Sequence, residues 1–225
     1  MEIITQLIDF IIHIDKYLAE IIQSYGVWTY LILFLIIFSE TGLVVTPFLP
    51  GDSLLFVMGA LGAAGALDFK LTVILMIIAA VGGNTLNYTI GKMIGNRILE
   101  SRRFQFINRI IKKEYIEKTQ AFYQKHGGKA ILLSRFLPIL RTFAPFVAGI
   151  GKMSITKFIV YNSAGGILWV STFMLGGYFF GNIPVVKNNF TYVIFGIILV
   201  SLLPAVITGI SSRKNKKVII KTAEE

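Results

Sequence analysis

The chain has 225 residues, of which 55% are hydrophobic and 15% are charged. Soluble domains carry about 25% charged residues, so the surplus apolar surface is typical of a protein embedded in lipid. The absence of cysteine excludes disulfides and cysteine-ligated metals, and two histidines are few for a zinc or haem site, so we expect no metal and no cofactor. The net charge of +10 comes from bases that flank apolar runs, which favours membrane orientation over nucleic-acid binding.

Residues 1–24 place apolar side chains at helical spacing and charged ones opposite, which predicts an amphipathic helix in the membrane interface. The apolar run 27–67 follows, and several charged or helix-breaking residues interrupt it: Glu40, Pro47, Pro50, Gly51 and Asp52. Segment 71–95 is an uninterrupted apolar span. Segment 96–129 is basic with a second apolar helix face, so we expect it to lie in the cytoplasm.

A second interrupted apolar run covers residues 130–150. It contains Arg135, Pro138, Arg141 and Pro145. Two uninterrupted spans follow at 155–180 and 190–210, and the basic tail 211–225 is expected to be cytoplasmic.

The distribution of basic residues predicts the topology. If 130–150 crossed the membrane once, the basic tail would be exported; the segment is too short to cross twice, because each crossing needs about 20 residues. We therefore expect a re-entrant hairpin that enters from the cytoplasm and returns there. By the same argument 27–67 enters from outside and returns outside. Irregular backbone at this depth requires shielding by protein or a water-filled cavity.

One hairpin from each face is typical of an inverted-topology repeat. The glycine pattern supports this, because Gly91 and Gly95 are spaced like Gly177 and Gly181. An alignment on Tyr25-Gly26 and His126-Gly127 would pair Glu40 with Arg141. The predicted fold is an all-α polytopic membrane protein with two opposed re-entrant hairpins, about three full transmembrane helices and two amphipathic interfacial helices.

Charged residues within the hairpins are the candidate functional groups, since an ionised side chain at the bilayer centre costs about 2.5–3.5 kcal/mol even on lenient scales. We expect Arg135 and Arg141 to bind an anionic group, because arginine stays charged and its planar fork suits phosphate. The alternative is a buried Glu–Arg pair that only locks the hairpins together. Helix-breaking and small residues are expected to support the hairpin tips: Pro50, Gly51, Ser53, Pro138 and Pro145.

The two acids each have two interpretations. An apolar setting favours a protonated Glu40 and a nearby arginine favours an ionised one, so Glu40 either exchanges a proton or stays a permanent partner of Arg141. Asp52 follows Pro50-Gly51 and precedes an apolar run, which is typical of a helix N-cap. The same helix start would also direct backbone N–H groups at an anion.

Two motifs resemble those of the bacterial DedA family. The first is Glu40 followed by Pro47-Phe48-Leu49-Pro50-Gly51-Asp52-Ser53. The second runs from Arg135-Phe136-Leu137-Pro138-Ile139-Leu140-Arg141 through Pro145, Ala148-Gly149, Met153, Phe158, Asn162, Gly165 and Trp169. The resemblance covers about 26–181, and eukaryotic VTT-domain scramblases are more distant relatives.

This resemblance implies two opposed re-entrant hairpins and multi-pass insertion in the bacterial cytoplasmic membrane. It implies proton-driven transport of a lipid, most often undecaprenyl phosphate from the outer to the inner leaflet. It assigns the family's essential acids to Glu40 and Asp52 and its essential arginines to Arg135 and Arg141. The expected partners are membrane lipids (undecaprenyl phosphate or a phospholipid) and protons, and a homodimer is left open.

Three other functions follow from the same pattern. The chain could be a phosphatidylethanolamine flippase, or a proton-coupled ion or osmoprotective transporter without a lipid substrate. An intramembrane lipid phosphatase is disfavoured because its chemistry needs histidines that do not follow Ser134-Arg135. We therefore predict a transporter rather than an enzyme.

Overall fold

The computed structural model describes residues 22, 24–43, 51–100 and 128–181, with isolated positions at 183, 184, 186, 192 and 196. The regular structure in these ranges is helical and comprises α3 (Trp28–Gly42), α4 (Gly51–Ala63), α5 (Phe69–Glu100), α8 (Lys129–Ser134), α9 (Pro138–Ile150) and α10 (Ile155–Phe180). Most of four predicted segments lies outside the described residues: 1–24, 96–129, 190–210 and 211–225.

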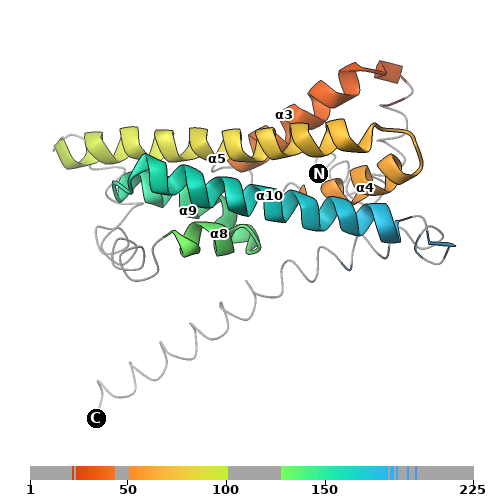
Figure 1. Cartoon of the computed structure of the whole chain (residues 1–225). Helices are drawn as coiled ribbons and strands as arrows, with labels where there is room; N and C mark the ends of the chain where they lie inside the picture. The colour runs from red at the N-terminus through yellow and green to blue at the C-terminus, as the bar shows by residue number, and fades with distance from the viewer. Residues whose placement is uncertain are drawn as a thin grey trace, which may run out of the picture.

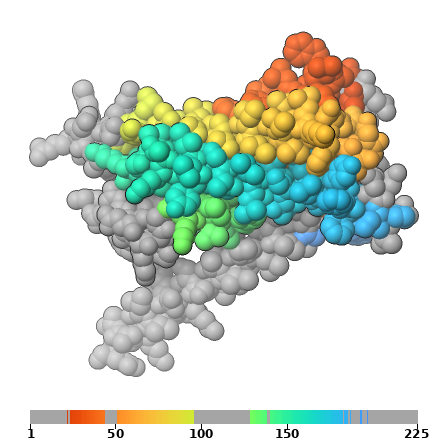
Figure 2. Space-filling view, in the orientation of Figure 1, coloured from red at the N-terminus to blue at the C-terminus, as the bar shows by residue number. Residues whose placement is uncertain are grey.

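Two long helices form the body of the described structure (Figures 1 and 2). Both α5, over Phe69–Gly95, and α10, over its whole length, are apolar and long enough to cross a membrane. They run antiparallel, because Phe69 contacts Tyr178 at 4.5 Å between ring centroids, while Tyr88 stacks on Phe158 at 4.4 Å. The predicted bounds of α10 are confirmed.

The apolar span of the other long helix ends at Gly95, as predicted for segment 71–95. The helix itself continues beyond that span to Glu100. A glycine at this position does not stop the helix, because good helix formers follow it and the next residues include no proline. The basic segment therefore begins as a continuation of the long helix.

The remaining helices are short because their sequences contain helix breakers. Pro138 begins α9, and the preceding Leu137 is extended, with φ −115° and ψ 107°, as steric clash with a following proline favours. This ends α8 after six residues. In the first half, α3 has 15 residues and α4 has 13. Both predicted interrupted runs are thus pairs of short helices.

The two halves pack reciprocally. Helix α4 packs along α10, and α9 packs along α5; α3 packs on α5, and α8 on α10. Each long helix therefore holds one short helix from its own half and one from the other half. An inverted repeat produces this reciprocity.

Matching glycines permit the closest of these contacts. A Cβ on Gly91 would overlap the Phe146 carbonyl, and one on Gly177 would overlap the Phe56 carbonyl. The partner helices also contribute glycines at these crossings, namely Gly149 of α9 and Gly59 of α4. The glycine pattern seen in the sequence therefore has a physical cause: backbone meets backbone at equivalent places in both halves.

The close contacts give a different correspondence from the alignment that paired Glu40 with Arg141. The match of Gly59 with Gly149, extended at the same spacing, pairs Arg141 with Gly51 at the start of α4. Glu40 lies on α3, whose counterpart α8 ends at Ser134. The two correspondences differ because α8, with six residues, is much shorter than α3, with 15.

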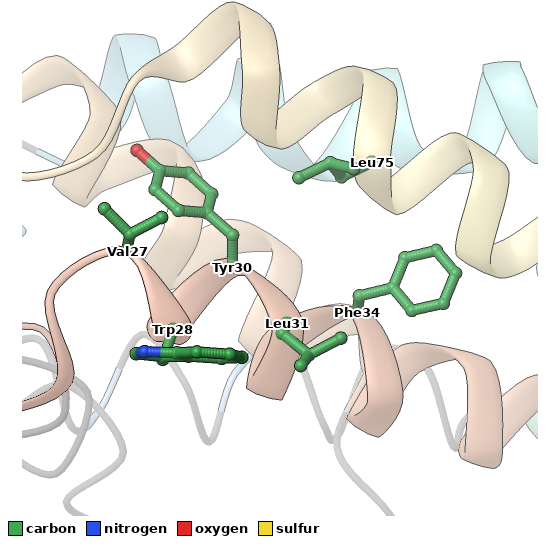
Figure 3. A pocket seen from close by; sticks show the side chains of 6 residues that line it. All are labelled: Val27, Trp28, Tyr30, Leu31, Phe34 and Leu75. Atoms are coloured by element: carbon green, nitrogen blue, oxygen red, sulfur yellow. The ribbon is translucent and has the colours of Figure 1, made fainter.

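A groove of about 470 Å³ opens between the start of α3 and α5 (Figure 3). Its lining is mostly apolar and carries two polar groups, the Trp28 indole N–H and the Tyr30 hydroxyl; it consists of Val27, Trp28, Tyr30, Leu31, Phe34 and Leu75. The Tyr30 hydroxyl accepts a hydrogen bond from the Asp68 backbone N–H at 2.9 Å, which ties α3 to the start of α5. The groove contains no charged side chain, so it is separate from the candidate site.

Adjacent glycines on α10 provide a test of the close packing. Gly177→Ala should destabilise the protein by about 1–3 kcal/mol, because its methyl group would enter the Phe56 carbonyl. Gly176→Ala should be neutral or stabilising by up to about 1 kcal/mol, because its Cβ would lie 3.8 Å from the Phe56 ring. Thermal unfolding of the detergent-purified variants measures the difference. Equal stabilities would contradict the packing described.

Candidate functional site

The four predicted charged residues lie at the broken ends of the short helices. Glu40 is in the last turn of α3, Asp52 is in the first turn of α4, Arg135 caps the end of α8, and Arg141 is in the first turn of α9. Glu40, Arg135 and Arg141 are each at most 3% exposed, whereas the Asp52 side chain is 15% exposed. The site is thus buried and is most accessible beside Asp52.

Arg141 pairs with both acids. Its Nη1 donates to Asp52 Oδ1 at 2.8 Å, and its Nη2 donates to Glu40 Oε1. The expected pair between Glu40 and an arginine is therefore present, and Asp52 joins it. Two carboxylates around one guanidinium are stable in a buried position only because each charge has a partner.

Small residues and prolines shape the backbone around this cluster. Gly51 lies against the Glu40 carboxylate, so a Cβ there would overlap it. Pro138 begins α9, and Pro145 lies inside that helix, where it has no N–H to donate to the Arg141 carbonyl. Ser53 is buried on α4. Of the residues predicted to support the hairpin tips, only Pro50 lies outside the described residues.

Arg135 has a different environment. Its Nη2 donates to the Ala80 carbonyl at 3.1 Å and to Asn162 Oδ1 at 2.7 Å, and both acceptors are neutral. Within the described part of the chain, it forms no ion pair, and its Nε and Nη1 have no hydrogen-bond acceptor. Arg135 is therefore a buried cation with two free donor groups and no carboxylate partner among the described residues.

Asparagines on the two long helices hold the broken backbone in place. Asn162 Nδ2 donates to the Val81 carbonyl at 3.0 Å, and Asn87 Nδ2 donates to the Thr142 carbonyl at 2.7 Å. The amide of Asn84 satisfies its neighbours when its Nδ2 faces the Thr41 carbonyl at 3.1 Å and its oxygen faces Arg135 Nη2 at 3.0 Å. These asparagines therefore connect neighbouring helices by hydrogen bonds.

Trp169 on α10 connects the two arginines with the acids. Its Nε1 donates to Asp52 Oδ1 at 2.8 Å, the same oxygen that accepts from Arg141. The guanidinium carbons of Arg141 and Arg135 lie 5.0 and 5.9 Å from the indole centroid. Such cation–π contacts are worth about 0.5–2 kcal/mol, and more when they are desolvated.

Trp169 belongs to the second sequence motif, but no role was predicted for it. Its position in an apolar helix could have indicated one, because a buried indole N–H needs an acceptor and polar acceptors are few there. Chemically, guanidinium groups with free donors are suited to an anion, and a carboxyl group is suited to proton exchange. Within the described residues, no three His, Cys, Asp or Glu side chains cluster as metal ligands would.

Known proteins similar to this chain are membrane proteins, and a family model matches more than half of it. Residues 49–179 match the family model described as the VTT domain. The chain is 54% identical over 216 residues to protein DedA of Escherichia coli K12, covering 95% of this chain and 97% of that protein. It is 42% identical over 174 residues to an uncharacterised membrane protein of Mycobacterium leprae, covering 77% and 76% of the two chains.

A third relative is inner membrane protein YqjA of E. coli K12. It is 36% identical over 156 residues, and the match covers 69% of this chain and 69% of that protein. No solved structure matches the chain.

Removing the shared cation tests the ion-pair cluster. Arg141→Met should destabilise the protein by about 3–5 kcal/mol, because it removes the cation shared by the buried Glu40 carboxylate and the partly buried Asp52 carboxylate. Adding Glu40→Gln and Asp52→Asn should restore a large part of that loss. Unfolding in mixed micelles of increasing denaturing detergent measures both.

The matched control is Lys157→Met on the exposed face of α10, which should change stability by less than about 0.5 kcal/mol. A triple variant no more stable than Arg141→Met alone would show that the carboxylates do not depend on this arginine.

Proposed function

Because this chain belongs to the DedA family of VTT-domain membrane proteins, we propose that it moves a phosphate-bearing lipid between the leaflets of the bacterial inner membrane. The observation that carries the proposal is Arg135, a buried guanidinium with two free donor groups and no carboxylate partner among the described residues. A buried cation with free donors is suited to a phosphate oxygen. Undecaprenyl phosphate, moved from the outer to the inner leaflet, is the leading substrate.

The proposal includes two opposed re-entrant hairpins, α3–α4 from outside and α8–α9 from the cytoplasm. At 1.5 Å per residue, the 15 residues of α3 extend about 22 Å and the 13 of α4 about 20 Å, short of the roughly 30 Å hydrocarbon core. The basic residues of 96–129 favour a cytoplasmic location for that segment. The four charged helix ends then meet near the midplane.

The ion pairs suggest an order of events. With both acids ionised, Arg141 is held by carboxylates and Arg135 is the first contact for phosphate. Protonation of Glu40 removes one of the two acceptors of Arg141 and lets this arginine turn its Nη2 to the same phosphate. Release of that proton to the other side restores the pair and expels the lipid phosphate, so the proton gradient drives transport. Asp52, the most accessible of the four, is the proposed route for the proton.

Two other transport functions use the same groups. A phosphatidylethanolamine flippase would bind its phosphate at the same arginines. A proton-coupled ion or osmoprotective transporter would use Glu40 and Asp52 without a lipid, and would exchange protons for cations in liposomes that lack lipid phosphates. We propose a transporter rather than an enzyme, because the four charged groups include no nucleophile paired with a base.

Single cysteines test the hairpins, since the natural chain has none. A membrane-impermeant maleimide should label Ser24→Cys and Ala66→Cys from outside the cell. It should label Lys129→Cys and Thr156→Cys only after permeabilisation. Leu43→Cys, near the proposed tip, should resist labelling from both sides, although Leu43 is 45% exposed on the protein surface. Labelling of Leu43→Cys from the cytoplasm would mean that α3 crosses the membrane.

Reconstituted protein tests the transport itself. Proteoliposomes containing undecaprenyl phosphate are supplied with an external phosphatase that reports arrival of the lipid phosphate at the outer surface, under an imposed proton gradient. Arg135→Ala with Arg141→Ala should slow arrival about tenfold or more, since charged hydrogen bonds to phosphate are worth about 1.5–3 kcal/mol each.

Lys92→Ala with Lys157→Ala is the matched control, because it removes the same charge from exposed positions on the two long helices and should leave the rate within about twofold. Parallel liposomes with labelled phosphatidylethanolamine distinguish the two lipid substrates. Unchanged transport in the double arginine variant would refute the arginine site.

A further inference from the structure

We propose that Trp169 is the positioning residue of the anion site, where its indole face takes the place of a counter-ion for Arg135, holds the ion-paired Arg141 beside it, and leaves the unused N–H donors of both arginines free for phosphate. The inference rests on the proposed function, because it concerns how the same arginines are prepared for a lipid phosphate. It assigns a role to a side chain that touches no substrate itself.

An indole face can stabilise a buried arginine without using up its N–H donors. A carboxylate stabilises a buried arginine by accepting its N–H groups, and those groups are then no longer available to a ligand. Arg141 shows this, because Glu40 and Asp52 occupy its Nη1 and Nη2. An aromatic face stabilises a cation through its quadrupole and leaves the edge of the guanidinium free.

The donors left free are those that a phosphate needs. Arg135 Nε and Nη1 and Arg141 Nε are buried and have no acceptor among the described residues. Both guanidinium carbons lie within 6 Å of the centre of one indole ring, at 5.0 and 5.9 Å. Three free donor groups from two guanidiniums therefore lie beside one ring, and Trp169 is 0% exposed, so water screens their charge only weakly.

The indole N–H adds a second constraint. It donates to Asp52 Oδ1 at 2.8 Å, and the same oxygen accepts from Arg141 Nη1 at 2.8 Å. The hydrogen bond therefore fixes Asp52 in the position in which it holds Arg141 over the ring. Trp169 on α10, Asp52 on α4 and Arg141 on α9 are positioned together, although they come from three helices.

Two substitutions separate the face from the N–H. Trp169→Phe keeps a smaller aromatic face and loses the donor, whereas Trp169→Leu loses both. We expect the affinity for dodecyl phosphate, measured by titration calorimetry in lipid nanodiscs, to fall about threefold in Trp169→Phe and about tenfold or more in Trp169→Leu. Dodecanol and inorganic phosphate are run in parallel, which distinguishes a lipid phosphate from the free ion.

The second tryptophan makes a spectroscopic test available. The chain has two tryptophans, and Trp28 is 68% exposed at the start of α3, so Trp28→Phe leaves Trp169 as the only indole. In this variant, dodecyl phosphate should change the tryptophan emission in a saturable way, and dodecanol should not. A purely structural tryptophan would show no such response.

Val170→Ala is the matched control for packing, because Val170 is equally buried on the same helix but has no contact with either arginine among those described. It should lower the unfolding temperature and leave the affinity for dodecyl phosphate within about twofold. If Val170→Ala loses as much affinity as Trp169→Leu, the effect is general packing and the role assigned to Trp169 is wrong.

The remaining outcomes separate this inference from the proposed function. If Trp28→Phe binds dodecyl phosphate and Trp169→Leu binds it equally well, the phosphate site stands and the positioning role of Trp169 is refuted. If neither the natural chain nor Trp28→Phe binds dodecyl phosphate, both the proposed function and this inference are refuted.

Discussion

The pairing of Arg141 with Glu40 and Asp52 constrains the rest of the described structure, because three charges buried among apolar helices need one another. The three residues come from α9, α3 and α4, so the pairing fixes three helix ends at a single point. These ends are irregular backbone, which lipid cannot satisfy. Asn84 and Asn87 on α5 supply hydrogen bonds to the carbonyls at two of the ends. The buried charges and the broken helices therefore depend on each other.

Close backbone contact makes this arrangement rigid. At the crossings of α5 with α9 and of α10 with α4, glycines leave no space for a methyl group. Packing of this kind is the main attraction between helices in lipid, where apolar side chains gain little by leaving their surroundings. Each short helix that carries a site residue, α4 or α9, is thus attached to a long helix of the other half. The site lies between two firmly packed pairs of helices.

The sequence predicted much of the fold and part of the site, and the differences have physical causes. The span 155–180, the two interrupted runs and the importance of Glu40, Asp52, Arg135 and Arg141 followed from hydropathy and from the energy of buried charge. The pair between Glu40 and Arg141 was one of the two interpretations of Glu40, and it is present. That Asp52 joins this pair could not follow, because it depends on how α4 and α9 pack in the folded chain. The end of the apolar span at Gly95 was predicted, whereas the continuation of α5 to Glu100 was not. The contacts of Trp169 were missed because they come from three other helices.

The site is asymmetric although the scaffold around it is reciprocal. The equivalent of Arg141 in the first half is Gly51, which is small enough to lie against the Glu40 carboxylate. Both acids come from the first half and both arginines from the second, so the ion pairs cross the boundary between the halves and do not repeat within each half. When two halves pack in a similar way, two alternative arrangements of the halves can have similar energies. An asymmetric set of charges would then make the balance between them depend on binding of a proton or an anion. Since Arg141 lies on α9 and Asp52 on α4, which pack on different long helices, a movement of α4 and α10 relative to α5 and α9 would change the distance between these two charges.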